Sequence, residues 1–219
     1  MRMKKYVVID FEMCRVPLEV KCSYHNKQEI IQIGAALMSE DYIVVDTFNE
    51  YVSPQYGYVD SYIRNLTGIS GKDLYGADHI DTVMGRFLDW LPDEDVIFIS
   101  WSDNDCKQLR KELQCKEIVI SERLEHIFET WVDCQPLFSE KLHSKKRYSL
   151  EEALVAADIC TEGRAHDGMI DAYNTALLYA KMQKEDELVL NEDYRKAHYG
   201  EALEGLTYSL ADIIKAAGF

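Results

Sequence analysis

The chain has 219 residues, of which 47% are apolar, and its net charge at neutral pH is −15. This length and apolar content suffice for one substantial domain with a real core. The acidic balance argues against a protein that holds long nucleic acid on a basic surface, although divalent cations between carboxylates and phosphates would still admit a short or single-stranded substrate.

The chain shows no sign of export. No stretch approaches the roughly 20 consecutive apolar residues that are needed to cross a bilayer. The N-terminal segment MRMKK passes directly into a strand pattern and lacks a signal-peptide core. The six cysteines form neither a CxxC pair nor the close spacing of a disulfide framework. We therefore expect a cytoplasmic protein with reduced thiols, without a membrane partner and without a transition-metal site built from cysteines.

The first predicted strand ends in two carboxylates. An apolar run at 6–9 leads into Asp10, Phe11 and Glu12. Side chains alternate across a strand, so Asp10 and Glu12 should project from one face and Phe11 from the other. Two adjacent like charges at the end of a buried strand are costly unless a cation neutralises them, which is the physical case for a divalent metal. Taken alone, the pattern favours the simpler alternative of a strand that runs into a solvated loop.

Strand patterns continue through the first quarter of the chain. Residues 15–28 are polar and irregular and predict a loop. The run IIQIGAALM at 30–38 predicts a second strand, in which Gly34 would allow close approach of a neighbour. A turn at 39–41 leads to a third strand at 42–52, so the early part of the domain is predicted to be an antiparallel meander.

The later segments alternate between helical and strand patterns. Apolar residues recur at helical spacing up to Pro92, and the following apolar run at 96–99 is typical of a buried strand. Ser149 and Glu152 fit a capping box at the start of a helix. In chain order we expect helices at 58–66 and 80–91, a strand at 96–99, a helix at 102–113, a fifth strand at 117–120, and helices at 122–128, 137–142, 149–157 and 168–183.

The tail from 184 to 219 begins with a charged stretch and ends in SLADIIKAAGF, another amphipathic helical pattern. Strands followed by alternation with helices predict an α/β fold with a mixed five-stranded sheet flanked by helices. We expect residues 1–183 to form one domain and residues 184–219 to be a helical extension packed on it.

A second acidic site lies in ISWSDND, where Asp103 and Asp105 follow the predicted strand at 96–99. Acidic residues are favoured at a helix N-terminus, and Ser102 with Asp105 fits a capping box. On local grounds alone, capping is the favoured role for these carboxylates.

A third site lies in AHDGMID, residues 165–171. His166 and Asp171 are five residues apart, which on a continuous helix separates them by about 140°. They could converge only if His166 stands on the loop before the helix and Asp171 lies inside it, and Gly168 makes such a break plausible. Asp167 shares the face of Asp171 but is better placed to cap the helix. A lone histidine at a helix start is more often structural than catalytic.

Together these signals form an ordered pattern, which runs from Asp10-x-Glu12 through Asp105 to His166-x4-Asp171. At this point the sequence resembles the DEDDh exonucleases, relatives of polymerase proofreading domains with a ribonuclease-H-like fold. The resemblance covers about residues 4–183 and extends to the strand IIQIGAALM and the LTGI turn. It also includes SWSDND, which is similar to a segment of the subfamily that trims RNA 3′ ends.

The resemblance implies a set of metal ligands and a general base. Asp10, Glu12, Asp105 and Asp171 would hold two divalent cations, with Asp10 bridging both, and His166 would be the base. Hard oxygen ligands suit Mg²⁺ or Mn²⁺. We expect the histidine to be disordered or turned away when no substrate is bound. Asp103 and Asp167 remain rival carboxylates beside the expected ligands.

The resemblance also implies contacts to the substrate. The backbone around Met13 and Cys14 would meet the terminal sugar, and Leu66 and Ile69 would pack against the last bases. Phe11 and Trp101, in contrast, are expected in the core, because an aromatic side chain beside a buried strand usually packs inward.

The leading hypothesis is a two-metal 3′-to-5′ exonuclease that releases nucleoside 5′-monophosphates from single-stranded RNA or short oligonucleotides. Its partners would be single-stranded 3′ ends, of RNA rather than DNA. One alternative is a DNA proofreading or repair exonuclease with the same site. A different class of protein is a catalytically silent regulator on the same fold, against which the intact set of five residues argues.

Overall fold

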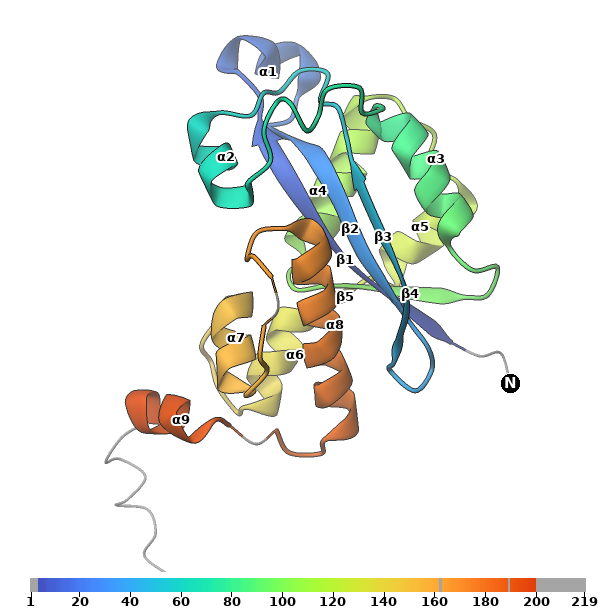
Figure 1. The fold of residues 1–219 in the computed structure, drawn as a ribbon. Coiled ribbons are helices and arrows are strands. Elements are labelled where there is room, and N and C mark those ends of the chain that lie inside the picture. The colour runs from blue at the N-terminus through green and yellow to red at the C-terminus, as the bar shows by residue number, and fades with distance from the viewer. Residues whose placement is uncertain (1–3, 162, 189, 200–219) are drawn as a thin grey trace, which may run out of the picture.

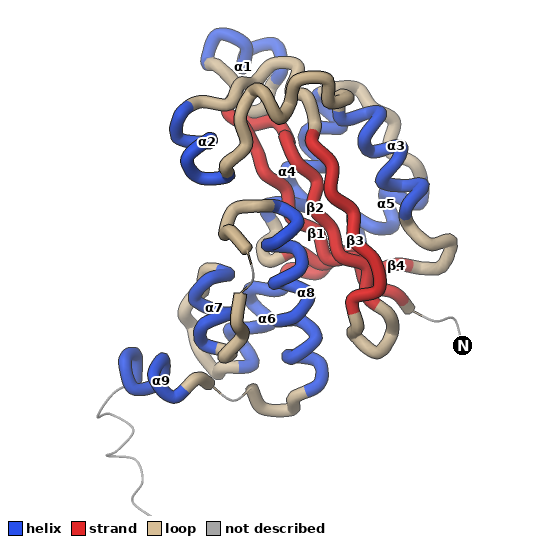
Figure 2. The backbone as a smooth tube through the Cα atoms, in the orientation of Figure 1, coloured by secondary structure: helices blue, strands red, loops and turns tan. Residues whose placement is uncertain are grey.

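A mixed five-stranded sheet forms the centre of the molecule (Figures 1 and 2). The structure, a computed structural model, describes residues 4–199 apart from 162 and 189. The strand order is β3-β2-β1-β4-β5, in which β1 pairs antiparallel with β2 and parallel with β4. The strands are β1 Lys5–Arg15, β2 Gln28–Met38, β3 Val44–Tyr51, β4 Val96–Ser100 and β5 Val132–Asp133. The predicted α/β fold with a mixed, helix-flanked sheet is therefore confirmed.

Helices cover both faces of this sheet, with α3, α4 and α5 on one side and α6, α7 and α8 on the other (Figure 2). Within the described part of the chain, no helix combines the length and apolar character needed to span a membrane. The helices are α1 Leu18–Tyr24, α2 Ser61–Thr67, α3 Ile80–Trp90, α4 Asn104–Cys115, α5 Glu122–Glu129, α6 Cys134–Lys141, α7 Leu150–Ala156, α8 Gly168–Lys184 and α9 Glu192–Tyr199.

Alternation along β1 decides which face carries its carboxylates. Val7, Ile9 and Phe11 are buried in the core cluster that β1 shares with α3, α4 and α5. Val8 is buried in the cluster on the side of α6, α7 and α8. Asp10 and Glu12 continue the series of Val8, so they project toward the α8 side of the sheet.

Two predictions about local structure are wrong. The expected fifth strand at 117–120 has no regular structure, and β5 is instead the short segment Val132–Asp133, which pairs with Ile99 and Ser100 of β4. The expected loop at 15–28 contains helix α1, which begins just after Pro17. Proline is favoured at a helix start because its missing N–H has no helical partner to lose there.

The C-terminal part of the chain continues beyond α8 into α9. Tyr194 of α9 is buried in the same cluster as residues of α7 and α8. The amphipathic helix expected at the end of the tail lies outside the described residues. The division between a domain at 1–183 and an extension at 184–219 stays a prediction.

A buried ion network fixes the end of the sheet at which β2 begins. Lys116, just after α4, contacts Glu29 of β2 at 2.7 Å and Glu112 of α4 at 2.9 Å. Glu29 also accepts hydrogen bonds from the backbone N–H groups of residues 55–57. Glu112 accepts one from the N–H of Ile30. The network therefore ties α4 to β2 and to the loop that leads toward α2.

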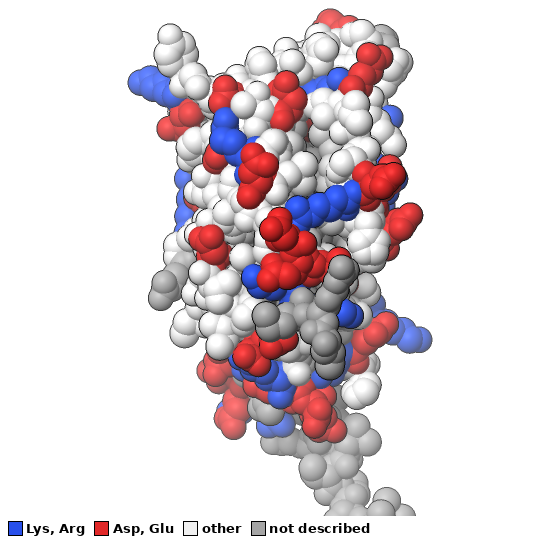
Figure 3. Space-filling view, turned by 90° about the vertical axis from the view of Figure 1, so that its right-hand side faces the viewer, with Lys and Arg blue, Asp and Glu red and all other residues white. Residues whose placement is uncertain are grey.

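Charged side chains of both signs are interspersed on the face shown in Figure 3, which is the right-hand side of Figure 1. Basic side chains also pair with acidic ones elsewhere in the structure: Arg86 of α3 contacts Glu50 of β3 at 2.5 Å and Asp78 at 2.8 Å. Figure 3 shows no continuous basic area among the described residues of this face, as expected for a chain with a net charge of −15.

Candidate active site

Two carboxylates of β1 form the base of the candidate site. Asp10 lies opposite Gly34 of β2, and Glu12 lies opposite Gln32. The register shifts between Glu12 and Met13, so the strand is irregular just beyond the second carboxylate. Glu12 is only 8% exposed, so its charge lies largely outside water. The predicted placement of both acids on one strand face, with Phe11 buried on the other, is confirmed.

Asp105, in the first turn of α4, brings a further carboxylate to the end of β1. Its Oδ1 accepts a hydrogen bond from the N–H of Phe11 at 3.2 Å. The pairing of β1 with β4 extends to Val8 and Ile99, so the carboxylate meets β1 beyond the end of that ladder. Asp103 is the residue at the helix cap, makes no capping bond and pairs with Lys107. The interpretation of Asp105 as a simple capping residue is therefore wrong.

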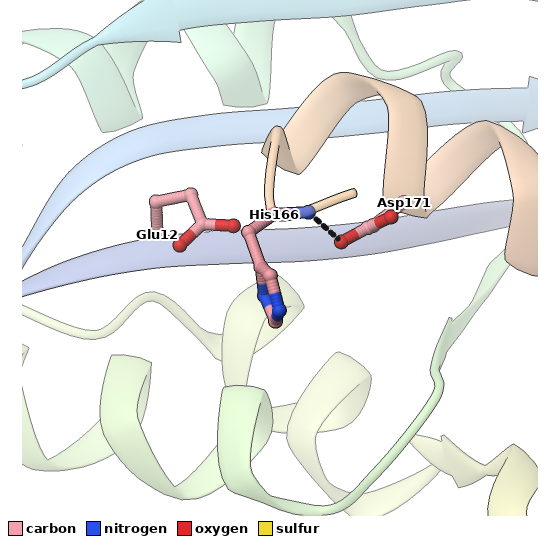
Figure 4. Close-up of side chains that lie close together, drawn as sticks. All are labelled: Glu12, His166 and Asp171. Atoms are coloured by element: carbon pink, nitrogen blue, oxygen red, sulfur yellow. Dashed lines mark hydrogen bonds between the residues drawn. The ribbon is translucent and has the colours of Figure 1, made fainter. Parts of the chain in front are cut away.

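The third part of the site comes from the start of α8. His166 stands on the preceding loop with φ of +62°, and its N–H donates to Oδ2 of Asp171 at 2.9 Å. Figure 4 shows this bond and the neighbouring Glu12 of β1. Glu12, His166 and Asp171 each offer one ligand atom, and these atoms lie within 4.8 Å of one another. The structure therefore brings His166 and Asp171 together, and His166 is not turned away from the carboxylates, contrary to that part of the expectation for the histidine.

Close backbone packing brings α8 to this position. A Cβ atom on Gly34 of β2 would overlap backbone atoms of Gly168 and Met169, so helix and sheet meet without an intervening side chain. A Cβ on Gly168 would lie 3.1 Å from the carbonyl oxygen of Asp10. The predicted close approach at Gly34 is thus confirmed, and its neighbour is the first turn of α8.

A buried amide holds this first turn in place. Oε1 of Gln32 accepts from the N–H of Gly168 at 3.0 Å, and its Nε2 donates to Asp167 at 3.2 Å and to Asn49 of β3 at 3.0 Å. Asp167 itself caps α8 by accepting from the N–H groups of Met169 and the following residue, as predicted. Gln32 therefore links two strands to the helix that carries Asp171.

The converging carboxylates destabilise one another's charge. Burial raises the pKa of Asp10 well above its usual range, and Asp105, Glu12 and Asp171 raise it further. Burial also raises the pKa of Glu12 to about 8. Burial raises the pKa of Asp105 to about 7, although the hydrogen bond from the N–H of Phe11 acts to lower it. Burial also raises the pKa of Asp171.

This charge distribution fits a hard divalent cation. Among the described residues, no lysine or arginine pairs with any of the four carboxylates. Buried carboxylates without a counter-charge are costly, and oxygen ligands of this kind suit Mg²⁺ or Mn²⁺. Of the four carboxylate residues, Glu12 and Asp171 place ligand atoms within 4.8 Å of each other and of His166. A cation bound there would lower the free energy of the ionised carboxylates.

The side chains expected at the substrate differ in exposure. Met13 and Leu66 are half-buried and reach the surface. Cys14 and Ile69 are buried in a small cluster that packs α2 against the sheet, so their side chains contribute to the scaffold. The contact predicted for Cys14 involves backbone and stays a prediction, as do the contacts of the other three. Phe11 and Trp101 are buried, as expected.

Two residues at the site had not been predicted from the sequence, namely Gln32 and Arg164. Gln32 bonds to residues 135 and 136 positions away, and Arg164 to residues 98 and 99 positions away. A polar side chain inside the apolar run IIQIGAALM was the available signal for Gln32. The sequence around Arg164 offers no comparable signal.

Comparison with known proteins agrees with this geometry. The model of the RNase_T exonuclease family matches residues 7–179. The chain is 29% identical over 215 residues to ERI1 exoribonuclease 2 of Danio rerio, covering 87% of this chain and 37% of that protein. It is 25% identical over 186 residues to the 3'-5' exonuclease Snipper of Drosophila melanogaster, covering 74% of this chain and 64% of that one.

A solved structure shows the same fold. The nuclease domain of 3'hExo, described as a DEDDh family member bound to rAMP, matches with a TM-score of 0.67 at 20% identity and covers 85% of this chain and 96% of that one. The chain spans about a third of the length of the ERI1 relatives that it matches. The family match covers most of the chain. The chain therefore belongs to the exonuclease family, as its likeness to the DEDDh exonucleases predicted.

Proposed function

We propose that the chain removes nucleotides from the 3′ end of single-stranded RNA by hydrolysis of the terminal phosphodiester bond. The observation that carries the proposal is the meeting of carboxylates from β1, α4 and α8 beside a histidine, in a site where no described lysine or arginine pairs with them. Membership of the exonuclease family supports the class of reaction.

Asp10, Glu12, Asp105 and Asp171 are the residues that we propose as ligands of two divalent cations, Mg²⁺ or Mn²⁺. When bound, such ions would neutralise charge on the phosphate, activate a water and stabilise the leaving oxygen. The protein's own contribution is to hold the carboxylates together. Burial and the hydrogen bond from Phe11 keep Asp105 in place, and the seat of α8 on β2 does the same for Asp171.

His166 is the residue that we propose as the general base. Histidine suits this role because a ring nitrogen of neutral imidazole can accept a proton from a water molecule. The bond from its own N–H to Asp171 fixes the backbone of His166 against the carboxylate cluster. Its ring is exposed, so it is open both to the substrate and to the solvent that finally receives the proton.

The proposal that the chain prefers RNA to DNA is supported by the names of the relatives that it matches. Several matched proteins are named ERI1 exoribonuclease 2, at 29% and 27% identity for those of Danio rerio and Homo sapiens. A site that approaches the terminal ribose can read the 2′-hydroxyl, which is the group that distinguishes RNA from DNA. The negative net charge of −15 favours short or single-stranded ends over long duplexes.

The test is a product assay on single strands of identical sequence. RNA and DNA oligomers labelled at the 3′ terminal nucleotide are incubated with the chain in Mn²⁺, in Mg²⁺ and in EDTA. We expect metal-dependent release of labelled nucleoside 5′-monophosphate, faster from RNA, and none with Asp10→Asn. Equal release by wild type in EDTA, or cleavage at interior bonds, would overturn the proposal. Faster release from DNA would support the DNA exonuclease instead.

A further inference from the structure

The loop that carries His166 is attached to α2 by a single arginine. Nη2 of Arg164 donates to the carbonyl oxygens of Asn65 at 2.5 Å and of Leu66 at 3.2 Å. These carbonyls belong to the last turn of α2, about a hundred positions earlier in the chain. The contact therefore joins the segment of the proposed base to the turn that is expected to meet the terminal bases.

Gly68 leaves room for this contact because it has no side chain. It ends α2 with φ of +82°, and the position that its Cβ would take is filled by Nη1 of Arg164. The last carbonyls of a helix lack helical partners and lie at its negative end, where a cation is favoured. A guanidinium offers several N–H groups in one plane, so it can bond to two adjacent carbonyls where an ammonium group would meet them as a point charge.

The other side of the loop rests on α8. A Cβ on Gly163, which has φ of +84°, would lie 2.8 Å from Cδ1 of Ile170, so the loop passes directly over this side chain. Two residues after Arg164, the N–H of His166 bonds to Asp171. The loop is thus held by α8 at Gly163 and His166 and by α2 at Arg164.

We infer that Arg164 is a positioning residue, which holds His166 at the working distance from the substrate by tying its loop to α2. The inference rests on the proposed function, because it concerns the base of that reaction. Asp171 lies inside α8, which is seated on β2 independently of Arg164. Loss of the guanidinium should therefore loosen the loop and change the direction of the His166 side chain, while the carboxylate cluster stays in place.

The experiment compares Arg164→Ala with wild type on a short single-stranded RNA in Mn²⁺. A displacement of a catalytic group by about 1 Å can lower a rate about 100-fold, so we expect kcat to fall roughly 10- to 100-fold while KM changes little. Guanidinium chloride well below denaturing concentrations should restore part of kcat. A large rise in KM with unchanged kcat would overturn the inference and assign Arg164 to substrate binding.

A measurement of Mn²⁺ binding separates positioning from misfolding. The rise in melting temperature that Mn²⁺ produces should be the same in Arg164→Ala and wild type, because no carboxylate ligand is changed. Arg123→Ala is the matched control, since Arg123 of α5 also donates to a backbone carbonyl, that of Pro92. This variant should keep wild-type kcat. Loss of Mn²⁺ stabilisation in Arg164→Ala would contradict a role confined to the histidine loop.

Gly68→Ala gives a second, independent perturbation. Its Cβ would displace the guanidinium, so kcat should fall in an otherwise wild-type chain. Alanine at φ of +82° also strains the backbone, which lowers the melting temperature with or without Arg164. In the Arg164→Ala background the same substitution should lower kcat little further, because residues that act as a unit are not additive. Fully additive losses would count against the inference. If wild type itself releases no mononucleotide, the proposed function fails, whereas an active wild type with an equally active Arg164→Ala defeats only this inference.

Discussion

Gly34→Ala is the substitution that most sharply tests how the site is assembled. Gly34 is a position of β2 at which a Cβ atom would overlap backbone atoms of Gly168 and Met169 in α8. The neighbouring bond from Gly168 to Gln32 fixes the same turn. The added methyl group must therefore push the start of α8 away from β1, and Asp171 moves with it.

The expected size of the effect follows from this overlap. A Cβ on Gly34 would lie 2.1 Å from the carbonyl carbon of Gly168. Carbon atoms in contact normally lie about 3.5–4.0 Å apart, so the helix must retreat by about 1.5–2 Å. Overpacking of this kind costs about 1–3 kcal/mol. Each kcal/mol lowers the melting temperature of a chain of this size by about 2–4 °C. A shift of 1 Å at a catalytic group can lower the rate about 100-fold.

Gly85→Ala is the matched control. Gly85 lies inside α3, and a Cβ there would meet no atom within 4 Å. Alanine should stabilise this helix by about 0.5–1 kcal/mol relative to glycine and leave turnover unchanged. The assay measures melting temperature, apparent Mn²⁺ affinity and kcat on a short RNA for both variants. Wild-type kcat and Mn²⁺ affinity in Gly34→Ala would refute the claim that backbone contact seats the helix.

Three further predictions concern charge and burial. Asp10→Asn should abolish turnover and should also abolish the stabilisation of the fold by Mn²⁺. In wild type this stabilisation is about 2.7 kcal/mol when the Mn²⁺ concentration is 100 times Kd. Thermal melting with and without Mn²⁺ measures it. Lys116→Met leaves Glu29 and Glu112 buried without their cation and should cost about 3–5 kcal/mol in urea unfolding. Burial raises the pKa of the Cys134 thiol from its ordinary 9.0 to about 12. Because the folded state favours the protonated thiol, its contribution to stability is complete below pH 9 and is lost as the pH rises from 9 toward 12, which pH-dependent unfolding measures.

Each of these has a result that would count against it. An Asp10→Asn protein that still gains melting temperature with Mn²⁺ would place the cation elsewhere. A Lys116→Met protein as stable as wild type would mean that the two glutamates are not dependent on the lysine. Rapid alkylation of native Cys134 at pH 8.5, at the rate of the exposed Cys160, would show that the thiol is neither buried nor held protonated.

Period and spacing in the sequence predicted the outline of the site. Alternation along β1 placed Asp10 and Glu12 on one face, and this holds because a strand fixes side-chain direction residue by residue. The break before Gly168 made it possible for His166 and Asp171 to converge, the resemblance to the DEDDh exonucleases implied that they do, and the hydrogen bond between them agrees. The first prediction used local geometry alone, which a short stretch of sequence determines. The second needed the family resemblance, because the local pattern favoured a structural histidine.

The fifth strand shows where local patterns mislead. Residues 117–120 have an apolar pattern, and Ile118 and Ile120 do pack against the core, but without strand pairing. Strand β5 has two residues and exists because it meets the end of β4, a contact about 30 positions away in the chain. An apolar pattern indicates burial but not strand pairing, so the pattern could not show that residues 132–133, and not residues 117–120, form the fifth strand.

Gln32 and Arg164 show the same difficulty at the site. Their importance lies in hydrogen bonds to Gly168 and to Leu66, which fold topology brings near. Nothing in the neighbouring residues specifies those partners. The same holds for Asp105, whose local pattern favoured capping although its carboxylate bonds to the N–H of Phe11.

The most direct test of the account is a crystal of the chain soaked with Mn²⁺ and measured at a wavelength where manganese scatters anomalously. We predict anomalous peaks within coordination distance of Asp10, Glu12, Asp105 and Asp171, on the α8 side of β1. A well-ordered crystal with no peak among these four carboxylates, or with manganese bound only elsewhere, would contradict the central claim that they form one cation site.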